Sequence, residues 1–255
     1  MNNDFRIIQN DLARLGIGEG DKVLVHASFK SIGGVEGGIP TVIEALKDIV
    51  GTAGTLLFPT FTYDYVNFKN PIFDIKGTRC CVGAFPEVFR HTEGVKRSLH
   101  PTHSLAVWGK RRDEYIADHR LDNVEVGKNS PIFKLKDDGG KILMIGCGIT
   151  HNTLIHGVED FVRPPYVYRM DYTKEPYHRE YACVDENDRV TRAEFFHEFM
   201  ELYGYEQDYD KLSQIMELKG GNIKSAESFI FDAKEVWDTV EKKMREEPYF
   251  FVKKG

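Results

Sequence analysis

One stretch of this 255-residue chain gathers side chains that could perform acid–base chemistry around a proline. Residues 97–109 read Arg-Ser-Leu-His-Pro-Thr-His-Ser-Leu-Ala-Val-Trp-Gly, and the last part is typical of a short buried strand. A turn that carries titratable side chains to a strand end is a common place for a pocket. The alternative is a plain proline-directed connection in which the two histidines have no function.

A histidine and a glutamate three positions apart form a second candidate. His156 and Glu159 would be neighbours on one face of a helix over residues 151–163. A carboxylate that contacts an imidazole raises its basicity. The alternative is a solvated polar face on which Glu159 pairs with Arg163. This polar face would lie opposite an apolar stripe of Leu154, Ile155, Val158, Phe161 and Val162.

A glycine-rich turn over residues 28–38 separates a predicted strand from a predicted helix, whose first turn suits Pro40. This order directs free backbone N–H groups to one spot, which favours an anion. Neither the dinucleotide-binding fingerprint nor the P-loop motif is present. A tight turn without a ligand is the alternative.

Two pairs of residues could instead bind a metal ion. His100-x-x-His103 and His156-x-x-Glu159 offer three or four ligands of the kind found in catalytic zinc sites. The two pairs come from different elements, and nothing in the sequence fixes the distance between them. A metal-dependent hydrolase is therefore kept as an alternative, whereas a serine hydrolase is disfavoured because no G-x-S-x-G motif occurs.

Helices and buried strands alternate through most of the chain. Periodicity predicts helices over residues 3–15, 40–50, 82–90, 110–118, 130–136 and 151–163. Apolar runs predict strands over residues 21–27, 55–60, 105–108 and 141–146. We therefore expect an α/β fold with a central sheet, largely parallel or mixed, that is flanked by helices. In such folds ligands gather beyond the carboxyl ends of the strands.

The second half of the chain is less regular. We expect residues 166–222 to be a helical or irregular insertion that forms a substrate lobe within one domain of residues 1–255. A capping box from Thr191 to Glu194 predicts a helix over residues 191–203. A last strand is expected over residues 225–231, and a second box at Asp232 opens a helix that ends before Pro248.

The composition is that of an ordinary soluble protein, with 41% hydrophobic and 29% charged residues. The net charge of −6 argues against non-specific binding of nucleic acid. No apolar run approaches the roughly 18 residues of a membrane span, and the first residues are too polar for a signal peptide. We expect a cytoplasmic protein whose four cysteines are reduced, with neither nucleic acid nor membrane as a partner. The sequence carries no indication of the oligomeric state.

Taken in order, these segments resemble the aminoglycoside N3-acetyltransferase family, which is unrelated to the GNAT acetyltransferases. The resemblance covers about residues 5–165 and the last 30 residues, and the ordered set is specific although each piece alone is weak. The matching segments are His26-Ala-Ser28, Ser31-Ile-Gly33, Gly54-Thr-Leu-Leu-Phe-Pro-Thr60, Gly94-Val-Lys-Arg97-Ser98-Leu-His100-Pro101, His103-Ser104, Ser130-Pro131, Gly140-Lys-Ile-Leu-Met-Ile-Gly146 and Asn152-Thr153-Leu-Ile-His156-Gly-Val-Glu159.

The resemblance implies transfer of an acyl group, acetyl or another, from acyl-coenzyme A to an amine of an amino sugar. An ammonium must lose a proton before it attacks a thioester, so a base with a pKa near neutrality is required. His156 supported by Glu159 meets this description. The tetrahedral oxyanion needs donors, which the turn over residues 28–34 or the turn over residues 98–103 could supply. We therefore add His103 to the predicted catalytic residues.

The coenzyme is expected to lie along the glycine-rich turn, with further phosphate or amide partners in the second turn. The predicted coenzyme-binding residues are Ser28, Ser31, Gly33, Gly34, Val35, Arg97 and Ser98. The predicted residues for binding the amine substrate are His26, Asp64, Tyr65 and His100. No metal cofactor is expected.

Residues 166–222 depart from the family pattern. Family members that modify polycationic drugs need a concentrated acidic wall, but carboxylates alternate here with Arg163, Arg169, Lys174, Arg179 and Arg192. Such a mixed segment suits a singly aminated sugar, for example one linked to a nucleotide whose phosphates bind arginine. We therefore favour a biosynthetic amino-sugar N-acyltransferase. An aminoglycoside 3-N-acetyltransferase that confers antibiotic resistance is the main alternative, and a coenzyme-binding module without catalysis is another.

Overall fold

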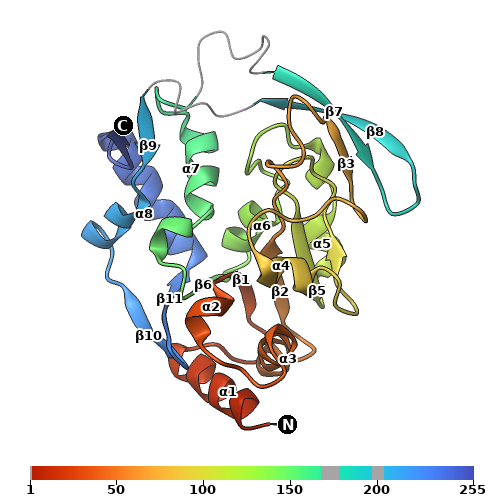
Figure 1. The fold of residues 1–255 in the computed structure, drawn as a ribbon. Helices are drawn as coiled ribbons and strands as arrows, with labels where there is room; N and C mark the ends of the chain where they lie inside the picture. The colour runs from red at the N-terminus through yellow and green to blue at the C-terminus, as the bar shows by residue number, and fades with distance from the viewer. Residues whose placement is uncertain (1, 168–177, 197–203) are drawn as a thin grey trace.

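A mixed seven-stranded sheet forms the centre of the computed structural model, which describes residues 2–167, 178–196 and 204–255 (Figure 1). The strands follow the order β10 (Lys219–Ile223), β11 (Ala226–Asp232), β6 (Lys141–Ile145), β1 (Lys22–Ala27), β2 (Thr55–Pro59), β5 (Leu105–Gly109) and β4 (Lys96–Arg97). β1 pairs in parallel with both β2 and β6, whereas the outer pairs are antiparallel. The predicted α/β class with a mixed sheet is confirmed.

Alternate side chains of β1 enter two hydrophobic cores, one on each face of the sheet. Val23 and Val25 pack in the core that includes α1 (Asn3–Leu15) and α3 (Ile39–Val50). Leu24 packs in the opposite core, with α6 (Pro131–Asp137), α7 (Leu154–Val162) and α8 (Ala233–Glu246). Because side chains alternate along a strand, His26 lies on the same face of β1 as Leu24, toward α7.

Shorter elements complete this layered arrangement. Among the described residues, the remaining helices are α2 (Phe29–Ile32), α4 (Ala84–Phe89), α5 (Arg112–Ile116) and the 3-10 turns η1 (His119–Leu121), η2 (Ile149–His151) and η4 (Tyr209–Gln214). α4 covers the end of β2, because Phe85 and Phe89 stack against Phe58 with ring centroids 5.3 and 4.2 Å away.

Hydrogen bonds mark the ends of α1 and the start of α8. Asn2 accepts the N–H of Phe5 at the start of α1, and Gly16 ends that helix with φ of 98°. Asp232 accepts the N–H of Glu235 at 2.8 Å, which confirms the cap predicted for the last helix.

The helix predicted over residues 191–203 is wrong where the structure describes it. Residues 190–196 form β8 (Val190–Phe196), which pairs along its whole length with β7 (His178–Val184). Ala193 and Phe195 alternate with exposed neighbours and enter a small core, so strand pairing overrides the local capping signal. The rest of that prediction, residues 197–203, lies outside the described residues.

Two small sheets lie beside the central one. β3 (Ile72–Asp74) adds to β7 in parallel, and β9 (Tyr205–Gln207) pairs with β12 (Val252–Lys254). The strand predicted over residues 225–231 is present as β11, but it is not the last, because β12 follows it. Within the described residues, no helix is both long and apolar enough to cross a membrane.

Candidate active site

A pocket of about 280 Å³ lies where the three parallel strands end. β1 contributes Val25, His26 and Ala27 to its wall, and Phe61 and Tyr63 follow β2. The turn after β6 contributes Cys147 and residues 150–153, and α7 contributes His156. The carboxyl ends of parallel strands meet at one edge of a sheet, so residues far apart in the sequence reach the same cavity.

His156 and Glu159 are in contact on α7, and His156 lines this pocket. His156 Nδ1 lies 3.2 Å from Glu159 Oε2, and the glutamate is fully buried. A carboxylate oxygen only accepts hydrogen bonds, so this contact favours the tautomer with its proton on Nδ1, in which Nε2 is an acceptor.

The alternative of a solvated face on this helix is wrong. Glu159 has no exposed surface, whereas Phe161, which that interpretation assigned to the buried stripe, is 54% exposed. The helix therefore turns its carboxylate inward.

Two tyrosines hold the buried carboxylate on both of its oxygens. Tyr166 donates to Glu159 Oε1 at 2.9 Å, and Tyr209 donates to Glu159 Oε2. The Tyr209 hydroxyl also lies 3.2 Å from His156 Nδ1. Such hydrogen bonds offset the cost of burying a charge and fix the rotamers of the pair.

The second ring nitrogen of His156 also has a neighbour. The amide nitrogen of Gln207 in β9 lies 3.2 Å from His156 Nε2. Gln207 and Tyr209 both line the pocket and come from the segment that we predicted only as a substrate lobe. Sequence analysis missed them, as it missed Tyr166, because only the tyrosine content of that segment stood out.

His26 lies in the wall of the pocket with its Nε2 3.4 Å from Thr153 Oγ1. Burial, with a smaller contribution from the charge of His151, lowers the pKa of His26 to about 3. The ring is therefore neutral at physiological pH. Its predicted contact with the amine substrate stays a prediction.

The two histidines of the turn over residues 98–103 have different positions. His103 lines the pocket, with its ring 4.5 Å from that of Phe61. His100 is fully buried behind it, where Nδ1 accepts the His103 N–H at 2.9 Å and Nε2 lies 3.1 Å from Val124 O. Both ring nitrogens of His100 are thus engaged inside the protein, away from the pocket wall.

The metal-site alternative finds no support in these positions. Within residues 2–167, 178–196 and 204–255, no group of three or more His, Cys, Asp or Glu side chains could hold a metal ion. His100, one of the four ligands considered, has both ring nitrogens engaged by backbone groups.

The glycine-rich turn lies beside the end of β6 and does not form the wall of the pocket. Ser31 Oγ donates to Gly146 O at 2.8 Å and lies 2.9 Å from Ser28 Oγ. Gly146 has φ of 62°, and a Cβ there would lie 2.4 Å from that of Ser31, so the two turns are in close contact. Gly33, Gly34 and Val35 follow on the same turn, and the predicted contact of these five residues with the coenzyme stays a prediction.

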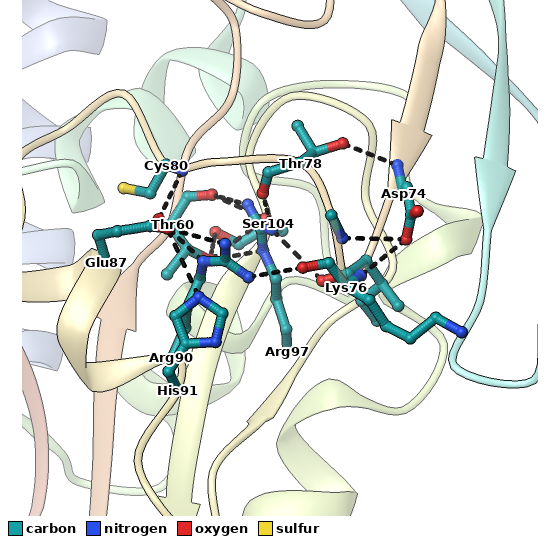
Figure 2. A network of polar contacts seen from close by, with 12 residues as sticks. Thr60, Asp74, Lys76, Thr78, Cys80, Glu87, Arg90, His91, Arg97 and Ser104 are labelled. Atoms are coloured by element: carbon teal, nitrogen blue, oxygen red, sulfur yellow. Dashed lines mark hydrogen bonds and ion pairs between the residues drawn. The ribbon is translucent and has the colours of Figure 1, made fainter.

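Arg97 lies in a buried network next to the pocket (Figure 2). Its guanidinium donates to Thr60 O and Thr78 O, both at 2.6 Å, and to Ser104 Oγ at 2.9 Å. Burial lowers the pKa of Arg97 to about 10. These bonds tie the loop after β3 to the end of β2, which carries part of the pocket wall.

Ser98 is also engaged inside the protein. Its hydroxyl accepts the Leu105 N–H at 2.8 Å and lies 2.8 Å from His119 Nδ1. The sequence indicates the chemical type of Arg97 and Ser98 but not the direction in which they point. Their observed contacts favour a structural role over the predicted contact with coenzyme phosphates.

Asp64 and Tyr65 are exposed on the loop after β2 and are not part of the pocket wall. Their neighbour Tyr63 is in the wall instead. Of the predicted catalytic and substrate residues, the structure thus brings together His26, His103 and His156 around one cavity, with Glu159 behind His156.

Comparisons of this chain with a family model and with individual proteins identify the same family. The family model for aminoglycoside 3-N-acetyltransferases matches residues 24–245. An aminoglycoside N(3')-acetyltransferase-like protein from Bacillus subtilis is 30% identical, and the alignment covers 92% of this chain and 90% of that protein. Aminoglycoside N(3)-acetyltransferase VII from Streptomyces paromomycinus is also 30% identical, over 91% of this chain and 88% of its own length.

A solved structure supports the same relationship. The structure of AAC-IIIb in its binary complex with CoASH has a TM-score of 0.78 and 27% identity, and 95% of this chain and 96% of that chain are covered. These matches confirm the predicted class of enzyme, an N-acyltransferase with an acyl-coenzyme A as co-substrate. The chain belongs to the aminoglycoside 3-N-acetyltransferase family.

Proposed function

We propose that this enzyme transfers an acetyl group from acetyl-coenzyme A to the 3-amino group of an aminoglycoside. The observation that carries the proposal is the His156–Glu159 pair beside the pocket at the carboxyl ends of the parallel strands. Relatives that are similar over most of their length support acetyl as the transferred group and an aminoglycoside as the acceptor, because their names state these molecules or the coenzyme.

In the proposed mechanism His156 is the general base. Its Nε2 removes a proton from the acceptor amine while the amine nitrogen attacks the thioester carbon. Glu159 stabilises the imidazolium that results, because its carboxylate contacts Nδ1. When the carbon–sulfur bond breaks, the imidazolium returns the proton to the leaving thiolate.

The charges near the pocket favour an aminoglycoside over the singly aminated sugar, nucleotide-linked or not, that the sequence predicts. Arg179 donates to Phe68 O at 2.9 Å and Arg192 pairs with Glu180, and neither lines the pocket. Arg169 and Lys174 lie outside the described residues. In contrast, the exposed carboxylate of Asp210 accepts a hydrogen bond from the wall residue Thr150 at 2.6 Å, next to the space that a cationic acceptor would occupy.

The direct test is release of coenzyme A thiol from acetyl-coenzyme A with a panel of acceptors. We expect aminoglycosides to give a higher kcat/KM than singly aminated or nucleotide-linked sugars, and the product to carry its acetyl group on the 3-amino nitrogen. Turnover with nucleotide-linked amino sugars alone would refute the proposed acceptor class. Mass spectrometry and NMR of the product identify the modified nitrogen.

Glu159→Gln should lower kcat/KM by about 100-fold, because the imidazolium loses a charged hydrogen-bond partner worth roughly 1.5–3 kcal/mol. The amide keeps the shape of the carboxylate but not its charge. Of the two tyrosines, Tyr166 and Tyr209, one can still donate to the amide oxygen, and the hydroxyl of the other can accept from the amide nitrogen. Steady-state kinetics of the folded variant check this prediction, and a rate within threefold of the original would exclude a role for the carboxylate in proton transfer.

A further inference from the structure

Asn152 has a buried side-chain donor without a partner in the wall of the pocket. The residue is fully buried and follows η2, two positions before α7 begins. Its Nδ2 has no hydrogen-bond partner among the residues that the structure describes. An unsatisfied buried donor is costly, so its presence in a pocket calls for an explanation.

The orientation of this amide is determined by its other atom. Asn152 Oδ1 accepts the backbone N–H of Leu154 at 3.2 Å at the start of α7. A flipped amide would set two donors against each other, so the oxygen must face Leu154. The Nδ2 atom of Asn152 therefore lies on the side of the amide away from the Leu154 N–H.

We propose that Asn152 Nδ2 donates a hydrogen bond to the thioester oxygen and stabilises the oxyanion that develops there, an inference that rests on the proposed acyl transfer. Asn152 and His156 line the same cavity and are separated by four positions, one on each side of the start of α7. The N-terminal end of α7 adds a favourable potential for negative charge. A donor without a partner before the reaction needs no rearrangement when charge appears, which is the condition for efficient electrostatic stabilisation.

The proposed step balances without any further reactant. The amine nitrogen forms a bond to the thioester carbon, and the carbonyl electron pair moves to the oxygen that Asn152 contacts. His156 holds the proton that the amine has lost. The electron pair then returns, the carbon–sulfur bond breaks, and the thiolate leaves with that proton.

Other buried atoms without a partner lie elsewhere. Among the described residues these include His119 Nε2, and His119 does not line the pocket. Asn152 combines a donor without a partner with a place in the lining of the cavity that holds the proposed base.

Asn152→Ala should lower kcat for acetyl transfer by about 100-fold, the usual effect of removing one oxyanion donor. The KM for acetyl-coenzyme A should change little, and the acid limb of the pH profile should stay in place because the base is intact. Asn152→Asp keeps an oxygen that accepts the Leu154 N–H but replaces the donor by a second oxygen. Its kcat should therefore fall by a similar factor. The matched control is Asn129→Ala, because the Asn129 amide bonds to Asp122 at 2.7 Å outside the pocket and should not affect kcat.

A spectroscopic measurement separates this role from a structural one. The infrared carbonyl stretch of ¹³C-labelled acetyl-coenzyme A should shift to lower frequency when the labelled molecule binds the original enzyme, and this shift should be smaller in the Asn152 variants. If both variants fail to fold, the original enzyme alone can still refute the inference, because an unshifted stretch would show that no donor contacts the carbonyl oxygen. An unshifted stretch, or Asn152 variants with unchanged kcat, would overturn the inference.

Failure of this inference and failure of the proposed function give different results. If the enzyme acetylates aminoglycosides and the Asn152 variants do so equally fast, only the oxyanion role is wrong. If the enzyme acetylates no aminoglycoside, the acceptor is wrong. The role of Asn152 is then tested through hydrolysis of acetyl-coenzyme A, which forms the same type of oxyanion.

Discussion

Replacing His156 by alanine should reduce kcat/KM for acetyl transfer by roughly 10²–10⁴-fold, the usual contribution of a general base. The attacking amine nitrogen would then have no acceptor for the proton that it must lose when it bonds to the thioester carbon. Binding of acetyl-coenzyme A should be nearly unchanged, because the substitution affects proton transfer. Steady-state kinetics with saturating acetyl-coenzyme A, together with a binding titration, measure both quantities.

The control for this prediction is an exposed histidine outside the pocket. His91 lies 3.5 Å from Glu87 with 60% of its side chain exposed, so His91→Ala should retain full activity. Loss of stability in His156→Ala is also expected to be limited, because Tyr166 and Tyr209 still donate to the Glu159 carboxylate. A His156→Ala enzyme that keeps more than a tenth of the original kcat/KM would contradict the assignment of the base.

Acidification should destabilise the fold steeply below about pH 6.5, because three buried histidines cannot take up protons while folded. Burial lowers the pKa of His26 and of His100 to about 3, and lowers the pKa of His119 well below its usual value. The unfolded chain binds these protons near pH 6.5. The stability due to neutral histidines is therefore complete above pH 6.5 and is lost as the pH falls toward 3.

The expected size of this effect is large. Each such histidine costs about 1.4 kcal/mol of unfolding free energy per pH unit below its unfolded pKa. His26 and His100 together should thus remove about 4 kcal/mol between pH 6.5 and pH 5, a large part of the 5–15 kcal/mol of a typical protein. His119 acts in the same direction.

Urea unfolding at pH 7, 6 and 5 tests this prediction. His91→Gln should leave the slope unchanged, because that ring is exposed. An unfolding free energy that stays constant from pH 7 to pH 5 would show that the buried rings can be protonated in the folded protein.

Local patterns predicted the central layers well. The periodicity of residues 3–15 and the apolar run of residues 141–146 each depend on neighbours in the sequence, and both elements appear as α1 and β6. The cap at Asp232 depends on one residue three positions away, and it is also present. Such signals need no knowledge of distant partners.

Pairing between distant segments could not be predicted in the same way. The Thr191–Glu194 pattern satisfies a helix cap locally, but residues 190–196 pair with β7 and bury Phe195. The order of the strands could not be predicted either, because β11 pairs with β6 inside the sheet rather than lying at an edge. These outcomes depend on contacts that one sequence does not display.

The candidate site was predictable only in part for a related reason. The spacing of His156 and Glu159 predicts their contact, because both lie on one helix. Their partners Tyr209 and Gln207 are about 50 residues away, and Arg97 carries the right charge for a phosphate but points into the protein. Residue type and helical spacing are visible in a sequence, whereas side-chain direction is a property of the packed structure.

The most direct test of the account is rescue of the His156→Ala enzyme by added imidazole. If His156 acts by removing a proton from the acceptor amine, free imidazole that enters the vacated space should restore acetyl transfer in a saturable manner. The rate should rise with the basicity of substituted imidazoles, and the original enzyme should not respond. A variant that is already active without imidazole, or an imidazole response equal in the original enzyme, would contradict the central claim that the His156 imidazole is the base.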